Sequence, residues 1–297
     1  MRILRYDDDR IGVMHGEHVV DISELITYRP YRGPQGSMEE LISSFDAYRP
    51  KIEALITAGV HAPISKVRLR SPLARPSRVL AAFVNYWNDP DRSAGRKPLE
   101  FFHKSPHLIG PGGDLQLPDV DAVVEFQPEV ELAFVIGRAA RHVRERDAMD
   151  HVFGFIPYVD LSARGMTRKS QFLPKGQDGF SACGPWITTR DEIGDPHDLT
   201  IRSWINGEPK QNFSTSLMVY SIPEQIAWLS RFVELRPGDL VTTGGFHAGL
   251  GPINVGDMLE IEITGLGRTH FLTAGDSPHK AAQFKPGGGG GLAMTPV

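Results

Sequence analysis

The stretch PEVELAFVIG, residues Pro128 to Gly137, decides the fold prediction because it reads as a β strand from end to end. Alternate side chains of a strand point to the same face. One face here is bulky and apolar throughout, and it consists of Val130, Leu132, Phe134 and Ile136. The opposite face begins with two carboxylates, Glu129 and Glu131. The pattern therefore predicts a strand with a core face and, on its other side, a pair of neighbouring acids.

The two neighbouring acids have two interpretations. Carboxylates on one face repel each other unless positive charge lies between them, and a divalent cation bound through oxygen supplies that charge. Hard carboxylate ligands suit Mg²⁺, Mn²⁺ or Ca²⁺ better than zinc. The alternative is that the face is solvated and both glutamates are ordinary surface charge. For an isolated Glu-x-Glu pattern, surface charge is the commoner outcome.

Outside this strand, the chain reads as many short strands joined by turns. Its 31 glycines and 23 prolines stand between short apolar runs, which is typical of β-rich folds. Met38 to Ala58 has helical periodicity, Asn206-Gly207 is a hairpin signal, and Ser221 opens a capping box. We expect a small α+β N-terminal domain over residues 1–72, a main domain over 73–280, and a flexible glycine-rich tail over 281–297.

Composition excludes several classes of protein. The 32 basic and 36 acidic residues give a formal charge of −4, which offers no general attraction to nucleic acid or to an anionic membrane. The single cysteine, Cys183, cannot form an internal disulfide. We find no signal-peptide pattern and no apolar run of the ~20 residues that cross a bilayer. The sequence therefore predicts a soluble, cytoplasmic protein with neither nucleic acid nor membrane as a partner.

Three further motifs follow the Glu-x-Glu strand. They are Asp160-Leu161-Ser162-Ala163-Arg164, Lys175-Gly176-Gln177-Asp178-Gly179-Phe180 and Gly184-Pro185. With this series the chain resembles the fumarylacetoacetate hydrolase family, in which such motifs occur in this order at similar spacing. The resemblance spans roughly residues 78 to 270, and it includes Asn85-Tyr86, Phe102-His103-Lys104-Ser105-Pro106, Pro237-Gly238-Asp239 and Thr243-Gly244. Each motif alone is unspecific, whereas the colinear series is specific.

The resemblance implies both a fold and a metal. The fold would be mainly β with minor α content, a mixed β-sandwich roll preceded by the small α+β domain, and usually a homodimer. The metal would be Mg²⁺ or Mn²⁺ held by Glu129, Glu131 and Asp160. A metal beside a lysine can chelate a 2-oxo acid and stabilise an enolate.

The resemblance also implies roles for residues around the metal. Lys175 would pair with the 2-oxo-carboxylate or enolate of the substrate. Gln211 and Thr215 would lie near the substrate, and Arg164 would support the pocket. Three of the residues also have structural interpretations: Asp160 as a strand-end cap, Arg164 as its ion-pair partner, and Lys175 as a solvated lysine beside a glycine turn.

The chain departs from the family where hydrolysis needs a base. Hydrolases of the family commonly carry a His and then a Glu on a lid shortly after the Asn-Tyr pair. The corresponding stretch is Trp87-Asn88-Asp89-Pro90-Asp91-Arg92, with Asp89 in the histidine's place. Asp89 and His247 are therefore candidate catalytic residues, and His103 is a further substitute.

The leading hypothesis is a metal-dependent hydrolase that cleaves a carbon–carbon bond in a small acylpyruvate or 1,3-diketo acid. The alternative is a lyase or isomerase of 2-oxo acids (a decarboxylase, dehydratase or tautomerase), which needs the metal-bound enolate but no activated water. A third hypothesis is a non-catalytic relative that only binds an oxo acid. The intact set of Glu129, Glu131, Asp160 and Lys175 argues against it.

Overall fold

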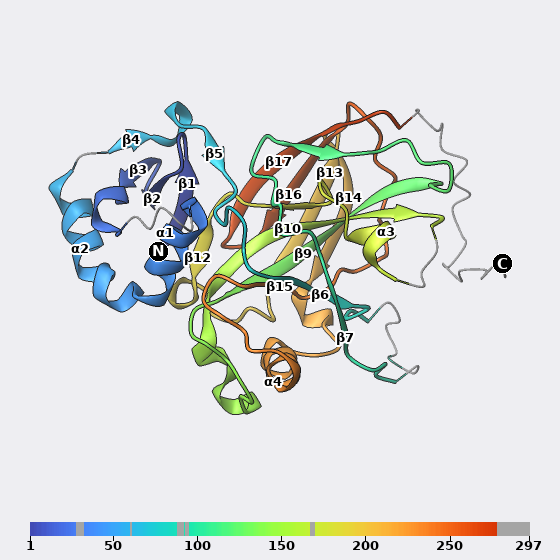
Figure 1. The fold of residues 1–297 in the computed structure, drawn as a ribbon. Helices are drawn as coiled ribbons and strands as arrows, with labels where there is room; N and C mark the ends of the chain where they lie inside the picture. The colour runs from blue at the N-terminus through green and yellow to red at the C-terminus, as the bar shows by residue number, and fades with distance from the viewer. Residues whose placement is uncertain (28–32, 60, 88–91, 93–94, 167–169, 278–297) are drawn as a thin grey trace.

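The computed structural model describes residues 1–27, 33–59, 61–87, 92, 95–166 and 170–277 of the chain. This part is built mainly of β strands in two sheets, with few helices (Figure 1). The mainly β prediction is confirmed. The candidate residue Asp89 and the predicted tail over 281–297 lie outside the described residues. No described helix combines the length and apolar character that a membrane span requires.

The first sheet has twelve strands and runs through the whole molecule. Its order is β4-β3-β2-β1-β12-β10-β9-β15-β6-β7, with β5 beside β1 and β11 beside β10. The strands are β1 (Arg2–Tyr6), β2 (Arg10–His15), β3 (His18–Asp21), β4 (Ala62–Pro63), β5 (Leu69–Arg70), β6 (Val79–Phe83), β7 (Glu100–His103), β9 (Glu125–Ile136), β10 (Val152–Arg164), β11 (Ser181–Cys183), β12 (Ile187–Thr189) and β15 (Leu240–Thr242). Since β1 pairs with β12, the N-terminal strands share a sheet with the rest of the chain. The domain boundary after residue 72 stays a prediction.

The second sheet has five strands in the order β14-β13-β16-β17-β8. They are β8 (Asp114–Gln116), β13 (Thr200–Ile205), β14 (Glu208–Ser214), β16 (Met258–Ile263) and β17 (Gly267–Ala274). Asn206 and Gly207 connect β13 to β14 with φ angles of 52° and 78°. Positive φ at both positions is what a two-residue hairpin turn requires, so the hairpin predicted at Asn206-Gly207 is confirmed.

The helices are α1 (Gly33–Ser43), α2 (Phe45–Ala58), α3 (Phe172–Lys175) and α4 (Ile222–Phe232). The helical structure predicted over Met38–Ala58 is confirmed, but it is divided into two helices, because the chain leaves the helical conformation at Ser44. The break lets both helices turn apolar side chains into one core. At α4 the capping box is confirmed: Ser221 Oγ accepts from the Glu224 backbone N–H, and the Glu224 carboxylate accepts from the Ser221 N–H.

Strand β9 lies between β10 and β15 and is buried on both faces. Its bulky face, including Leu132 and Phe134, contributes to the main core, which also holds residues of the second sheet. Ala133 and Val135 on the other face belong to a core shared with the N-terminal elements. The acidic face is therefore not solvated, and the surface-charge interpretation of the Glu-x-Glu pair is wrong.

Because β9 depends on its apolar face, we expect Leu132→Ala to lower the free energy of unfolding by about 2–5 kcal/mol. Leu132 is fully buried. Leu272 on β17 is 40% exposed, so Leu272→Ala is the matched control and should cost much less. Urea unfolding of both variants checks this. Equal losses would show that the β9 face is not a stabilising core.

Candidate metal centre

The pairing of β9 with β10 brings three acids together. In the antiparallel register Asp160 lies opposite Glu129, and Glu131 is two residues further along the same face of β9. Oxygen atoms of all three carboxylates lie within 4.8 Å of one another. Their side chains are almost completely buried. The structure thus brings together the three residues predicted as metal ligands.

Three cationic side chains surround this acidic cluster. Lys104 Nζ lies 2.5 Å from Asp160 Oδ1, and Lys175 Nζ lies 2.6 Å from Asp160 Oδ2. Lys175 Nζ is also 2.9 Å from Glu129 Oε1, which Arg164 approaches to 2.5 Å. Both lysines are buried. The structural interpretation of Lys175 as a solvated surface lysine is therefore wrong.

The ion pairs set the protonation of this cluster. Burial alone would raise the pKa of Glu129, but Lys175, His247 and Arg164 hold it well below its usual value. Burial would likewise lower the pKa of Lys175, but Asp160 and Glu129 raise it above the ordinary value. Lys175 and Glu129 are therefore held as an ammonium and a carboxylate.

Glu131 differs from the other two acids. Among the described residues, the ion pairs of the cluster reach Glu129 and Asp160, and none reaches Glu131. Its Oε2 accepts a hydrogen bond of 3.0 Å from the backbone N–H of Gly244. Burial, with the nearby charges of Asp160 and Glu129, raises the pKa of Glu131 well above its usual value. Glu131 is thus a buried acid with no ion pair among the described residues, and a bound cation would stabilise its negative charge.

These observations fit a divalent metal. The donor set consists of carboxylate oxygens, which Mg²⁺ and Mn²⁺ prefer, whereas zinc commonly takes nitrogen or sulfur. A cation beside Glu131 would also compensate the one acid that the lysines and Arg164 leave unpaired. The backbone of Gly245 passes close to the cluster, since a Cβ at this position would lie 3.4 Å from Glu129 Cβ.

A small pocket opens beside the cluster. Its wall includes Glu129, Arg164, Lys175 and His247, together with Phe102. His247 Nε2 lies 3.6 Å from Glu129 Oε2, and the side chain is 41% exposed. The histidine therefore lies at the mouth of the pocket, between the acids and solvent. His103 is exposed and is not among the residues that line this pocket.

The two predicted substrate residues lie behind this wall. Gln211 Nε2 donates to the carbonyls of Phe246 (2.6 Å) and Ala248 (3.2 Å), and so fixes the loop that carries His247. The Thr215 hydroxyl is fully buried and accepts a 2.9 Å hydrogen bond from the Leu199 backbone N–H. Neither lines the pocket as described, so their contact with substrate stays a prediction.

Lys104 is the residue that sequence reasoning missed. Its motif, Phe102–Pro106, contributes to the resemblance, but the only role predicted from this motif was that of His103 as a possible base. The signal was present in the acids themselves, because three buried carboxylates need more positive charge than Lys175 alone supplies. Lys104 meets that need from the segment that follows β7, 56 residues before Asp160.

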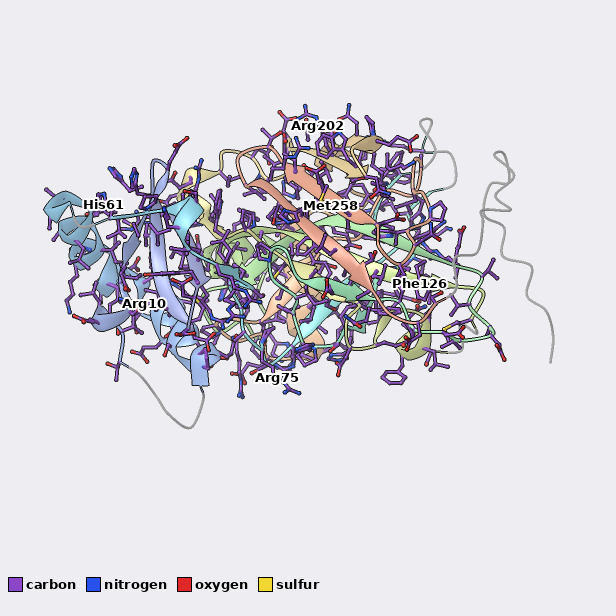
Figure 2. The ribbon with its side chains drawn as sticks, turned by 90° about the horizontal axis from the view of Figure 1, so that it is seen from above. Arg10, His61, Arg75, Phe126, Arg202 and Met258 are labelled. Atoms are coloured by element: carbon purple, nitrogen blue, oxygen red, sulfur yellow. The ribbon has the colours of Figure 1, made fainter. Side chains whose placement is uncertain are left out.

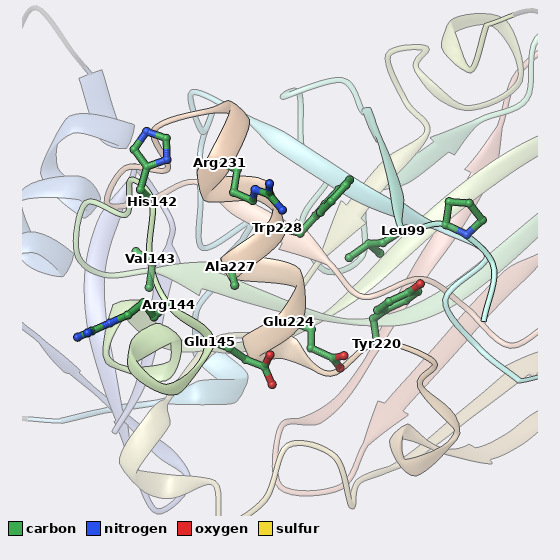
Figure 3. A pocket seen from close by; sticks show the side chains of 11 residues that line it. Leu99, His142, Val143, Arg144, Glu145, Tyr220, Glu224, Ala227, Trp228 and Arg231 are labelled. Carbon is green, nitrogen blue, oxygen red and sulfur yellow. The ribbon is translucent and has the colours of Figure 1, made fainter. Parts of the chain in front are cut away.

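A second pocket is larger but has different chemistry. It holds about 530 Å³ between the segment before β7 and α4, and Leu99, Tyr220 and Trp228 form part of its wall (Figure 3). Of its acids, Glu224 already pairs with Arg96 at 2.6 Å and caps α4. Size alone would favour this pocket, but the buried convergent acids lie in the smaller one.

Fold and site together define a β-sandwich protein with a buried carboxylate centre flanked by lysines. A family model described as the C-terminal domain of fumarylacetoacetate (FAA) hydrolase matches residues 78–271. The chain belongs to the fumarylacetoacetate hydrolase family, as the motif series predicted.

Relatives support this assignment over nearly the whole chain. A maleylpyruvate hydrolase of Aquipseudomonas alcaligenes is 33% identical, with 90% of this chain and 97% of that protein covered. A mitochondrial oxaloacetate tautomerase of Xenopus laevis is 30% identical, with coverage of 90% and 88%. A crystal structure of maleylpyruvate hydrolase from Sphingobium sp. SYK-6 contains manganese(II) and pyruvate. It is 34% identical with a TM-score of 0.83, covering 93% of this chain and all of that one.

The ion pairs of Lys104 give a stability prediction. Lys104→Met leaves Asp160 with one buried cation in place of two, and we expect a loss of roughly 3 kcal/mol in unfolding free energy without added metal. Lys210 pairs with Glu208 at the surface, and Lys210→Met should change stability by less than about 1 kcal/mol. Urea unfolding in the presence of a chelator compares them. A Lys104→Met variant as stable as the wild type would contradict the proposed role of this ion pair.

Proposed function

We propose that this protein is a divalent-metal-dependent hydrolase that cleaves a carbon–carbon bond in a small acylpyruvate or related 1,3-diketo acid. The observation that carries the proposal is the buried cluster of Glu129, Glu131 and Asp160 with Lys175 in the same pocket wall. The similarity of the chain to maleylpyruvate hydrolases, one of them crystallised with manganese and pyruvate, supports this chemistry.

Glu129, Glu131 and Asp160 would hold the metal as Mn²⁺ or Mg²⁺. When bound, such an ion acts as a Lewis acid that polarises a 2-oxo acid and stabilises negative charge on its oxygens. With a metal bound and Glu131 ionised, the three acids would carry three formal negative charges, as many as the positive charges of Lys104, Lys175 and Arg164, although the ion pairs of these cations reach only Glu129 and Asp160. A divalent ion therefore leaves a surplus of two positive charges, which suits a substrate that carries a carboxylate and develops an enolate.

Lys175 and Arg164 are the cations that face the pocket, and they would bind this anionic substrate. Phe102 in the same wall lies beside the Lys175 ammonium, 5.7 Å from Nζ to the ring centroid. A partly apolar wall strengthens the attraction between an ammonium and a developing enolate, because few waters compete. Lys175 would thus stabilise the charge that appears when the carbon–carbon bond breaks.

Hydrolysis also needs a base for water. We assign this role to His247 at the mouth of the pocket, with Asp89, outside the described residues, as the other candidate. The imidazole would take a proton from water while the water oxygen bonds to the acyl carbonyl carbon. The electron pair of the broken carbon–carbon bond would move to the enolate, which is then protonated at carbon. The products are a carboxylic acid and a 2-oxo acid.

A second function has its own support. Tautomerisation of a 2-oxo acid needs the same stabilised enolate but no activated water. Oxaloacetate tautomerases are among the relatives, and the family's lid histidine is absent from the sequence. Enolisation of a 2-oxo acid such as oxaloacetate is therefore the alternative reaction of the same site.

Assembly and location are further proposals. The family resemblance supports a homodimer, which size-exclusion chromatography with light scattering would test. The composition supports a cytoplasmic location. We expect a small-molecule substrate and neither nucleic acid nor a membrane as a partner.

The ligand assignment predicts the effect of Glu131→Gln on metal binding. Removing one negative charge from a three-carboxylate site should weaken Mn²⁺ binding at least tenfold, measured by calorimetry or by the signal of free Mn²⁺ in electron paramagnetic resonance. Glu262 on β16 pairs with Arg202 in the second sheet, so Glu262→Gln is the matched control. Equal Mn²⁺ affinity in both variants would remove Glu131 from the ligand set.

The base assignment predicts a separation of reactions. With acetylpyruvate and the Mn²⁺ enzyme, we expect acetate and pyruvate in equal amounts. His247→Ala should slow this cleavage by roughly 10²–10⁴-fold, while hydrogen–deuterium exchange at C3 of the 2-oxo acid continues. Both are followed by proton NMR. Undiminished cleavage in His247→Ala would transfer the role of base to another group. Exchange without any cleavage by the wild type would favour the tautomerase.

A further inference from the structure

Three histidines gather on the N-terminal part of the first sheet, away from the carboxylate centre. His15 at the end of β2 pairs directly with His18 at the start of β3, across the turn of their hairpin. His61 stands immediately before β4, where Pro63 pairs with His18. Figure 2 shows His61 at the outer end of these elements, with Phe126 of β9 toward the other end of the molecule. His15 and His18 are exposed, and His61 is half-buried.

The distances of the His15 and His18 rings from the His61 ring are close to what a shared metal ion would impose. The ring centroids of His15 and His61 are 5.4 Å apart, and those of His18 and His61 are 6.3 Å apart. Two imidazoles bound to a tetrahedral ion at about 2.0–2.1 Å have centroids about 5 Å apart. The first distance already matches, and the second exceeds it by about one ångström.

The hydrogen bond of His61 is the second observation. Its Nε2 lies 3.1 Å from the carbonyl oxygen of Ile56 in α2. Since a carbonyl only accepts, Nε2 is the donor in this hydrogen bond, which leaves Nδ1 as the ring nitrogen that could face a metal. A metal-binding histidine almost always donates its other N–H to a carbonyl or carboxylate, which fixes both the tautomer and the ring orientation.

We propose that His15, His18 and His61 form a second metal site, which takes a divalent transition metal that prefers imidazole nitrogen, such as Cu²⁺ or Zn²⁺. Its nitrogen donors distinguish it from the all-oxygen carboxylate centre, which suits Mg²⁺ and Mn²⁺. Among the described residues, only the carboxylate cluster already has three ligand atoms within 4.8 Å. The side chains of His15 and His18 must therefore turn toward His61 to close on a metal, which their exposure at a hairpin end permits.

Metal binding at this site would join elements that are separate in sequence. His15 and His18 belong to the β2–β3 hairpin, whereas His61 lies in the connection from α2 to β4. A shared ion would cross-link the hairpin to that connection and stabilise the N-terminal strands. The site does not depend on the proposed hydrolase activity, because no residue is common to the two centres.

The test uses the full-length protein in excess Mg²⁺, titrated with Cu²⁺. Electron paramagnetic resonance should show one Cu²⁺ per chain with equatorial nitrogen ligands. His18→Asn and His61→Asn should each weaken this binding at least tenfold by calorimetry. The exposed His270 on β17 provides the control, and His270→Asn should leave the affinity unchanged.

Thermal unfolding gives an independent readout. Added Zn²⁺ should raise the midpoint of the wild type and of Glu131→Gln, in which the carboxylate centre is impaired, but not that of His61→Asn. Copper with only oxygen ligands, wild-type affinity in His61→Asn, or an equal Zn²⁺ effect in all variants would each overturn the proposal. The Mn²⁺ affinity of His61→Asn should equal that of the wild type, which separates this site from the proposed function.

Discussion

Three acids lie buried next to one another on the neighbouring strands β9 and β10, and the arrangement of the site follows from the charge they bring. Burying even one carboxylate without a partner is costly, and three within 4.8 Å of one another would also repel. The chain meets this cost with Lys104, Lys175 and Arg164, drawn from three separate segments around β9 and β10. Their ion pairs hold Glu129 and Asp160, whereas no ion pair among the described residues reaches Glu131, which accepts a hydrogen bond from the Gly244 backbone N–H. This asymmetry favours a cation site over a purely internal salt-bridge network.

The same asymmetry links the metal to the substrate. If a divalent ion binds the three acids, the positive charges of Lys175 and Arg164 at the pocket wall become available to bind an anion. A 2-oxo acid brings a carboxylate and develops an enolate, so it matches both the metal and Lys175. The loop that carries His247 at the pocket mouth is fixed by Gln211. Under the proposed function, His247 would decide between two outcomes of the same enolate chemistry: with an active base the site would hydrolyse its substrate, and without one it would only enolise it.

The sequence predicted the strand of Glu129 and Glu131, the hairpin at Asn206-Gly207 and the α4 cap, because each depends on local patterns. The motif series predicted the family. The burial of the acidic face could not be read locally, since it depends on β10 and β15 as neighbours and on the N-terminal core behind β9. Lys104 was missed because its partner Asp160 is brought near only by tertiary packing. The break at Ser44 was missed because the helical periodicity of the sequence continues through it. The roles of Thr215 and Gln211 in substrate binding were inferred from the family, and stay predictions.

We propose that Glu129, Glu131 and Asp160 bind a divalent ion while Lys175 turns to the substrate anion. The decisive experiment is a crystal structure with Mn²⁺ and pyruvate, with anomalous diffraction measured at the manganese edge. We expect one strong anomalous peak in contact with all three carboxylates, and the Lys175 ammonium beside an oxygen of pyruvate. A manganese peak that contacts none of these acids, or pyruvate bound away from Lys175 while the lysine keeps its pairs with Asp160 and Glu129, would contradict it.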